Sequence, residues 1–293
     1  MGDLMVTSGR TRVAGIIGHP VTHSLSPAMH NAGFKAANLD WVYVPFPVDP
    51  DYLEQALSGL FRAGVAGLNV TVPFKVAVME HLEGLTEEAM QIGAVNLLTR
   101  GKNGWIGDNT DGRGFVQALH ESGFDPEGKT VLLLGAGGAA RAVAHSLLFA
   151  GVDELIISNR TLERAEDLLD ELVESHEEAI VNLVDWEERS DPAILNWVDL
   201  IVNATSEGMG AVSGQESVLD LSCLAPENKP MVADIVYVPL YTPLIELAKN
   251  LGLPVLTGEK MLLYQGVISW ESWTNRPAPV VEMLNAMLKA LNI

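Results

Sequence analysis

A glycine-rich segment, residues 135–140, has the residue types and the spacing that bind a dinucleotide. It reads Gly-Ala-Gly-Gly-Ala-Ala, follows an apolar run that predicts a strand and precedes a helical stretch, which is the context of the G-x-G-x-x-A fingerprint. Gly135 would make the tight turn, Gly137 would let a pyrophosphate approach the backbone, and Ala140 would let helix and strand pack closely. Free N–H groups at the helix start would hold the phosphates.

The next strand and helix indicate which dinucleotide binds. An NAD site places an acidic residue about 20 residues further on, where it binds the ribose hydroxyls. Here the expected strand ends in Ser-Asn-Arg-Thr (158–161), without a carboxylate, and Arg164 follows. Two guanidinium groups suit the 2′-phosphate of NADP, whereas two merely solvated arginines would oppose the dipole of the helix that they open. The sequence therefore predicts NADP, bound by Gly135, Ala136, Gly137, Gly138, Ala139, Asn159, Arg160, Thr161 and Arg164.

Polar residues gather at expected strand ends and loops of the N-terminal part: Ser24, Ser26, Asn69, Thr71, Lys75, Asn96 and Asp111. Each has an ordinary structural explanation by itself, since serines cap helices, asparagines close turns and lysines lie on surfaces. Beside a separate NADP domain, the set favours a small substrate with many hydroxyl groups. Such a ligand requires neutral hydrogen-bonding partners and one acid–base group.

The elements that must position these residues alternate between strand and helix. In the first part, strands are expected at 13–17, 41–46 and 67–72, with helices at 27–35 and 51–63. After turn-forming residues at 125–128, strands are expected at 130–134, 154–158, 200–203 and 231–235, with helices at 139–150, 162–175 and 244–250. Repeated strand–helix units predict largely parallel sheets covered by helices.

A chain of 293 residues is long enough for two domains. We expect a mainly parallel α/β substrate domain at 1–112 and a Rossmann-type, doubly wound NADP domain at 113–258. The segment 259–293 is expected to be helical, with a break at Pro277 and Pro279, and to return to the first domain.

Composition and charge exclude several classes of function. The net charge of −20 repels phosphate backbones, which argues against nucleic acids and anionic membranes as partners. No apolar run reaches the roughly 18 residues of a membrane span, and because no basic segment followed by an apolar run opens the sequence, we do not expect a secretory signal. The single cysteine, Cys223, permits no disulfide within the chain, and the seven histidines show no His-Glu-x-x-His spacing. We expect a cytoplasmic protein without a metal site.

Several stretches, in this order, resemble the shikimate dehydrogenase family. They are Gly-His-Pro-Val-Thr-His-Ser-Leu-Ser-Pro (18–27), Asn-Val-Thr-Val-Pro-Phe-Lys (69–75), Gly-Ala-Val-Asn (93–96), Asp-Asn-Thr-Asp-Gly (108–112), Gly-Ala-Gly-Gly-Ala-Ala-Arg-Ala (135–142), Asn-Arg-Thr (159–161), Asn-Ala-Thr-Ser-Glu-Gly-Met (203–209), Tyr-Val-Pro-Leu-Tyr-Thr-Pro (237–243) and Met-Leu-Leu-Tyr-Gln-Gly (261–266). The resemblance covers nearly the whole chain. It implies the NADP-dependent, reversible reduction of 3-dehydroshikimate to shikimate, a step towards the aromatic amino acids.

The resemblance also implies roles for single residues. Ser24 and Ser26 would bind the substrate carboxylate, helped by Tyr237, and the ring hydroxyls would be bound by Asn69, Thr71, Asn96, Asp111 and Gln265. Lys75 would be the acid–base group, paired with Asp111. Residues near the cofactor would include Thr205, Ser206, Ile235, Gly258 and, with no physical reason of its own, Glu87. A homodimer is compatible with the resemblance.

Two alternatives stay open. One is a quinate/shikimate dehydrogenase that uses NAD, although hydroxyls at both Ser24 and Ser26 and the missing acidic residue after Ser158 favour shikimate and NADP. The other is a ligand-sensing homologue without activity, which should have lost the acid–base pair. The chain departs from the family's usual residues at Val238, Glu259, Lys260 and Trp270, which bears on fine specificity.

Overall fold

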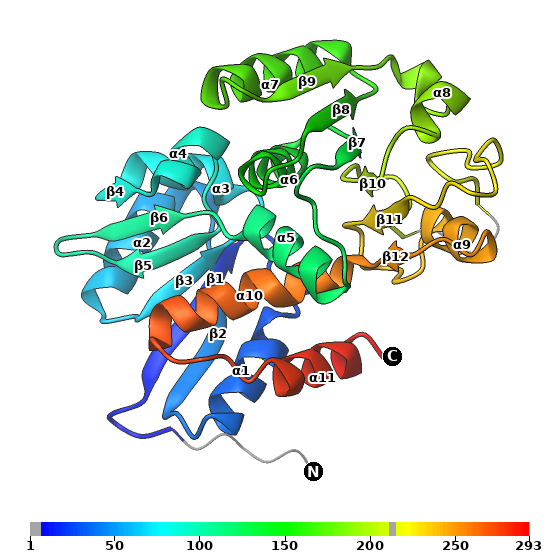
Figure 1. Cartoon of the computed structure of the whole chain (residues 1–293). Coiled ribbons are helices and arrows are strands. Elements are labelled where there is room, and N and C mark those ends of the chain that lie inside the picture. The colour runs from blue at the N-terminus through cyan, green and yellow to red at the C-terminus, as the bar shows by residue number, and fades with distance from the viewer. Residues whose placement is uncertain (1–6, 211–214, 293) are drawn as a thin grey trace. The chain divides into compact units, whose positions relative to one another are not determined.

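The computed structural model describes residues 7–210 and 215–292. The chain divides into two compact units (Figure 1). Unit 1 comprises Met1–Thr110 and Gln265–Ile293, and unit 2 comprises Asp111–Tyr264. Unit 2 thus includes Asp111 and Gly112, which the sequence had grouped with the substrate domain, and residues 259–264, which it had grouped with the C-terminal segment.

Unit 1 is built on a mixed six-stranded sheet in the order β2-β1-β3-β5-β6-β4. Its strands are β1 (Arg12–Gly18), β2 (Trp41–Pro47), β3 (Gly67–Val70), β4 (Gly84–Leu85), β5 (Leu97–Arg100) and β6 (Trp105–Asp108). The three strands expected from the sequence, β1, β2 and β3, run parallel, whereas β5 is antiparallel to both β3 and β6. The β5–β6 hairpin was not expected from the sequence.

The helices of unit 1 are α1 (Ser26–Ala36), α2 (Leu53–Arg62), α3 (Phe74–Ala77), α4 (Glu87–Ile92), α11 (Val280–Ala290), the part of α10 (Gly258–Thr274) from Gln265 onward, and the short 3-10 turns Pro50–Tyr52 and Val78–His81.

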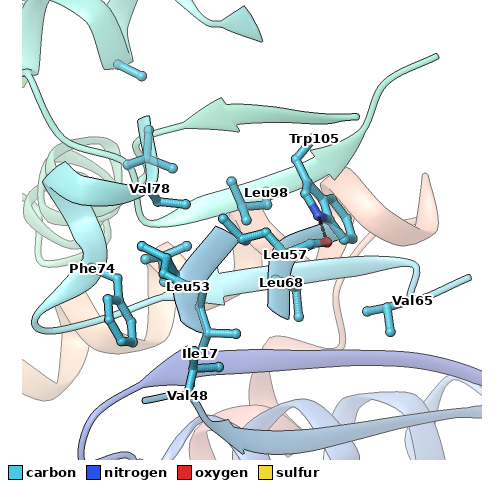
Figure 2. Close-up of a cluster of buried hydrophobic side chains, with 13 residues drawn as sticks. Ile17, Val48, Leu53, Leu57, Val65, Leu68, Phe74, Val78, Leu98 and Trp105 are labelled. Carbon is cyan, nitrogen blue, oxygen red and sulfur yellow. Dashed lines mark hydrogen bonds between the residues drawn. The ribbon is translucent and has the colours of Figure 1, made fainter. Parts of the chain in front are cut away.

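Leu53 and Leu57 lie one turn apart on α2, and both are buried with Leu68 of β3 and Leu98 of β5 (Figure 2). Trp105 completes this cluster by donating from its indole N–H to the Leu57 carbonyl at 2.9 Å (Figure 2).

Helix α10 returns to the sheet of unit 1 through two tryptophans. Trp270 is fully buried and stacks on Phe34 of α1, and Trp273 donates to the Leu98 carbonyl of β5 at 3.1 Å. A side chain at Gly67 in β3 would overlap the Trp273 ring, so the close approach of helix and strand requires glycine there. Trp270, noted above as a departure from the family's usual residue, is therefore part of the hydrophobic core.

Unit 2 is a fully parallel six-stranded sheet in the order β12-β11-β10-β7-β8-β9. Its strands are β7 (Thr130–Leu134), β8 (Glu154–Ser158), β9 (Ile180–Leu183), β10 (Leu200–Asn203), β11 (Met231–Asp234) and β12 (Val255–Leu256). Its helices are α5 (Asp111–Glu121), α6 (Gly138–Phe149), α7 (Leu162–Ser175), α8 (Pro192–Leu195), α9 (Pro243–Asn250) and the start of α10, with a 3-10 turn at Trp186–Glu188.

The strand order of unit 2 confirms the doubly wound prediction. Neighbouring strands are added outward from β7 in one direction through β8 and β9, and from β10 in the other through β11 and β12. In such sheets the ligand binds beyond the carboxyl ends of the strands at which the order reverses. Here those strands are β7 and β10, and the glycine-rich segment follows β7 directly. Among the described helices, none is both long and apolar enough to cross a membrane.

Candidate active site

The turn between β7 and α6 has the geometry that the glycine pattern predicts. Gly135 adopts φ +112°, and its N–H donates to the Ser158 carbonyl of the neighbouring strand at 2.8 Å. A Cβ at this position would meet the backbone of Ala204, after β10, at 3.0 Å, so both conformation and space require glycine. By contrast, a Cβ at Gly137 or Gly138 would meet no described atom within 4 Å. The backbone at the start of α6 is therefore open to a phosphate group.

Helix α6 is fixed from behind by small residues. Ala140 is fully buried, as expected for the third position of the fingerprint. On α5, a side chain at Gly112 would overlap the Ala142 carbonyl and the Ser146 hydroxyl of α6. This contact fixes the position of α6, and the open backbone at Gly137 and Gly138 lies at the start of the same helix.

The residues expected to bind the 2′-phosphate lie at the end of β8 and the start of α7. Arg160 and Arg164 are both exposed, and Ser158 and Asn159 leave this strand end without a carboxylate. The Arg160 guanidinium lies 3.5 Å from the Glu207 carboxylate, in a pair that is mostly exposed and therefore weak. Glu207 was not singled out from the sequence, although it follows the predicted residues Thr205 and Ser206.

A buried carboxylate connects the loops that follow β10 and β11. Asp234 accepts hydrogen bonds from the Asn203 amide at 3.0 Å, the Val236 N–H at 3.0 Å and the Thr242 hydroxyl at 2.6 Å. Asn203 in turn accepts from the Thr205 hydroxyl at 2.7 Å. Burial raises the pKa of Asp234 to about 6, while the three donors act in the opposite direction. This network positions Thr205 and the loop that starts at Ile235.

The loop after β11 also approaches the start of α10. A side chain at Gly258 would overlap the carbonyl oxygens of Ile235 and Val236, so glycine is required. Tyr237 is half-buried in this loop, and Val238 is exposed. Glu259, another of the noted departures, is buried and accepts from the Thr257 hydroxyl at 2.8 Å.

In unit 1, three of the proposed substrate residues belong to one buried polar network. The Asn69 side chain contacts the Asn96 carbonyl at 3.2 Å, the Tyr43 hydroxyl at 2.8 Å and the Ser269 hydroxyl at 2.9 Å. The Gln265 carbonyl accepts from Ser269 at 2.9 Å. Asn69 lies in β3, Asn96 directly before β5 and Gln265 in α10, and this network joins the Asn69 side chain to the backbone of the other two.

Thr110 closes the other end of this network. Its N–H donates to Asn96 Oδ1 at 2.8 Å, its hydroxyl accepts from Asn96 Nδ2 at 3.0 Å, and the hydroxyl also lies 3.2 Å from the Gln265 carbonyl. Sequence reasoning passed over Thr110, Tyr43 and Ser269. Only Thr110 carried a signal, because it lies inside the Asp-Asn-Thr-Asp-Gly stretch.

The remaining proposed substrate residues of unit 1 lie around β1 and β3. Ser26 opens α1, is buried, and donates its N–H to the Ser24 hydroxyl at 3.3 Å. Thr71 and Lys75 are half-buried, Thr71 directly after β3 and Lys75 on α3. The Lys75 carbonyl accepts from the Val95 N–H at 2.8 Å, which fixes the backbone of that helix turn.

Two proposed residues have local structural roles. Glu87 is exposed in the first turn of α4, after the capping residue Thr86, where a negative charge stabilises the helix dipole. Asp111 is also an acidic residue in the first turn of its helix, α5, and it is buried. Asp111 and Tyr237 belong to unit 2, whereas Ser24, Ser26, Asn69, Thr71, Lys75, Asn96, Gln265 and Glu87 belong to unit 1.

Comparison with known proteins identifies the family. Residues 16–98 match the shikimate dehydrogenase substrate binding domain, 118–239 the shikimate/quinate 5-dehydrogenase domain, and 258–288 the shikimate 5′-dehydrogenase C-terminal domain. The chain is 44% identical over 283 residues to the NADP⁺ shikimate dehydrogenase of Desulforamulus reducens, with 96% of each chain covered. The chain belongs to the shikimate dehydrogenase family. The same enzyme of Methanopyrus kandleri is 45% identical, again with 96% of each chain covered.

Solved structures share the family fold, and they include enzymes with other named activities. The shikimate 5-dehydrogenase of Thermus thermophilus in complex with NADP(H) and shikimate is 35% identical, with a TM-score of 0.84 over 95% of this chain and 99% of that one. The quinate dehydrogenase of Corynebacterium glutamicum in complex with NAD is 32% identical, with a TM-score of 0.86 over 95% and 99%. The 5-ketofructose reductase of a Gluconobacter strain is 33% identical, with a TM-score of 0.88 over 96% and 99%. The sequence resemblance and the fold class are thus confirmed.

Proposed function

We propose that this shikimate dehydrogenase family member catalyses the NADP-dependent, reversible reduction of 3-dehydroshikimate to shikimate. The observation that carries the proposal is the near-complete alignment with relatives that are named NADP⁺ shikimate dehydrogenases. The same fold also serves a quinate dehydrogenase with NAD and a 5-ketofructose reductase, so the choice of substrate and cofactor must rest on this chain's own residues.

The residues of unit 2 support NADP rather than NAD. The open backbone at Gly137 and Gly138 fits a pyrophosphate at the start of α6. After β8 the chain offers Arg160, and in the first turn of α7 Arg164, near the place where an NAD site would have a carboxylate. Guanidinium groups bind a dianionic phosphate with several donors at once, and Arg160 is exposed and accessible to it.

In the proposed reaction the residues of this chain bind the ring and supply the proton. NADPH, when bound, supplies the hydride that the substrate carbonyl carbon receives. The Lys75 ammonium donates a proton to the carbonyl oxygen as the C–O double bond is reduced, and its positive charge stabilises the developing alkoxide. Asp111 orients that ammonium and binds a neighbouring hydroxyl, while Ser24 and Ser26 bind the substrate carboxylate. In the reverse direction neutral Lys75 accepts the same proton.

The direct test is absorbance at 340 nm with purified protein, with shikimate or quinate as substrate and NADP⁺ or NAD⁺ as cofactor. Turnover chiefly with shikimate and NADP⁺ is the expected result. Preference for quinate or for NAD⁺ would overturn the specificity proposed from Ser24, Ser26, Arg160 and Arg164. A parallel assay of NADPH oxidation with 5-ketofructose tests the third chemistry found on this fold, and no turnover in any assay would favour a ligand-sensing protein.

A further inference from the structure

We propose that Tyr43 and Ser269 are positioning residues that make Asn69 present only a hydrogen-bond acceptor to the substrate. The inference deepens the proposed function and rests on it for the identity of the substrate. Asn69 would otherwise be free to offer either face of its amide, since an asparagine side chain carries both two N–H donors and one carbonyl oxygen.

The donors of Asn69 are both used inside the protein. Its amide nitrogen donates to Ser269 Oγ at 2.9 Å and to the Asn96 carbonyl at 3.2 Å. Tyr43 donates to Asn69 Oδ1 at 2.8 Å. A carbonyl oxygen accepts two hydrogen bonds. Among the contacts of Asn69 within the described residues, one acceptor position on Oδ1 therefore stays available.

The direction of these hydrogen bonds is fixed by a group that can only accept. The backbone carbonyl of Asn96 has no hydrogen, so the Asn69 nitrogen must face it and Oδ1 must face Tyr43. Tyr43 then has to donate to Asn69.

The hydrogen bonds at Ser269 require the same orientation of the Asn69 amide. The Ser269 hydroxyl donates to the Gln265 carbonyl at 2.9 Å, which leaves its lone pairs to accept from Asn69. Tyr43, Asn69 and Ser269 are all at most 4% exposed, so these hydrogen bonds are shielded from bulk water. Turning the Asn69 amide over would set two oxygens against each other at Asn96 and leave Ser269 without its donor.

The consequence concerns the substrate. A ring hydroxyl that contacts Asn69 must donate its hydrogen, because Asn69 has no N–H left to give. Removing Ser269 or Tyr43 takes away one of the three hydrogen bonds that hold the amide, so the free-energy difference between its two orientations falls and a smaller fraction of the molecules presents Oδ1 to the substrate. This should weaken substrate binding more than the chemical step.

The test compares matched variants on the same helix. Ser269→Ala removes the acceptor for Asn69, whereas Ser272→Ala removes an equivalent hydroxyl, exposed and bonded to the Ile268 carbonyl four residues earlier. Tyr43→Phe is matched by Tyr52→Phe, a largely exposed tyrosine. We expect Ser269→Ala and Tyr43→Phe to raise KM for shikimate about tenfold, with kcat and KM for NADP⁺ changed less than about twofold. The two controls should behave as the parent protein.

If Tyr43 and Ser269 act by positioning Asn69, their substitution should matter only while Asn69 is present. Variants that also carry Asn69→Ala therefore distinguish a positioning role from a general loss of structure. In that background Ser269→Ala and Tyr43→Phe should have no further effect on KM for shikimate. Effects that persist there, or an equal rise in KM for both substrates, would overturn the proposal.

The geometry can also be tested without turnover. In protein labelled with ¹⁵N-asparagine, the side-chain NH₂ signal of Asn69, assigned by its loss in Asn69→Ala, should be protected from hydrogen exchange. In Ser269→Ala this protection should fall, whereas in Ser272→Ala it should stay. Equal hydrogen exchange of the Asn69 NH₂ group in the parent, Ser269→Ala and Ser272→Ala proteins would refute the internal hydrogen bonding. This conclusion would hold even if shikimate proved not to be the substrate. Inactivity of the parent protein with protected Asn69 signals would instead contradict only the proposed function.

Discussion

Lys75 is half-buried on α3, a single helical turn that begins soon after β3 ends. Asn69 lies in β3 and Thr71 follows it, so the proposed proton donor and two proposed substrate contacts come from one short stretch. A positioned general acid typically contributes a factor of about 10² to 10⁴ in rate. At the scale of single residues, the proposed chemistry therefore depends on one ammonium group.

Substitution of Lys75 tests this dependence. Lys75→Ala should lower kcat by about 10²- to 10⁴-fold with little change in KM for shikimate, because the lysine acts on the proton and several other groups bind the ring. Lys102→Ala, in the exposed β5–β6 turn, serves as the control. The readout is steady-state absorbance at 340 nm, and turnover within about tenfold of the parent would remove Lys75 from this role.

Glu207 should oppose cofactor binding, because its carboxylate lies 3.5 Å from the Arg160 guanidinium that is proposed to bind the 2′-phosphate. Glu207→Gln should lower KM for NADP⁺ by about two- to fivefold at low salt, the range expected for an exposed charge pair. The effect should fade at high ionic strength, and KM for NAD⁺ should not change. An equal effect in an Arg160→Ala background would contradict the explanation.

Helix α6 depends on its contact with α5. Gly112 brings the two backbones so close that any side chain would overlap the Ala142 carbonyl. In the turn before α6, Gly135 is needed for its backbone conformation and Gly137 is proposed to be needed for a ligand, whereas Gly112 is needed for helix packing. At Gly59, within α2, a Cβ would meet no atom of the described residues within 4 Å, so this glycine provides the contrast.

The two substitutions should change stability in opposite directions. Gly112→Ala should lower the free energy of unfolding by about 1–3 kcal/mol through overpacking. Gly59→Ala should raise it by about 0.5–1 kcal/mol, because alanine favours an open helix position. Denaturant unfolding followed by circular dichroism measures both, and a Gly112→Ala protein as stable as the parent would show that α5 can move away from α6 without loss.

The elements differ in how well the sequence predicted them. The glycine turn was predictable because its residues are contiguous and each has a backbone reason, as at Gly135. The β5–β6 hairpin was missed, since each strand has only four residues and carries neither a clear alternation nor a long apolar run. The network around Asn69 was beyond prediction, because Asn69 and Ser269 are 200 residues apart in sequence and no local pattern reports their contact.

The molecule as a whole carries buried titratable groups whose effects on stability have opposite signs. Burial lowers the pKa of His30 to about 3, and neither ring nitrogen has a hydrogen-bond partner among the described residues. Unfolded His30 takes up a proton near pH 6.5 and folded His30 only near pH 3, so falling pH favours the unfolded state. Asp234, whose pKa is raised to about 6, has the opposite effect. Its contribution to the stability of the protein is lost as the pH rises through that value.

A variant without the His30 imidazole should lose part of this pH dependence. Between pH 8 and pH 5 His30 should remove about 2 kcal/mol of stability, and His30→Gln should flatten the stability curve by that amount regardless of any constant offset. His120→Gln, at an exposed histidine, should leave the slope as it is. Denaturant unfolding at a series of pH values checks both, and equal slopes in all three proteins would contradict a neutral, buried His30.

Unit 1 is discontinuous in the chain, and this has a consequence for how the protein is made. The ribosome releases the sheet of unit 1 first and then all of unit 2, and only the last residues bring Ser269, Trp270 and Trp273. Until they emerge, the nascent chain holds Asn69 without one of its partners and Gly67 without the ring that covers it. Unit 2 would therefore be complete before unit 1, and translation that stops early would leave a chain with the glycine-rich turn that is proposed to bind NADP but without the full network that is proposed to bind the substrate.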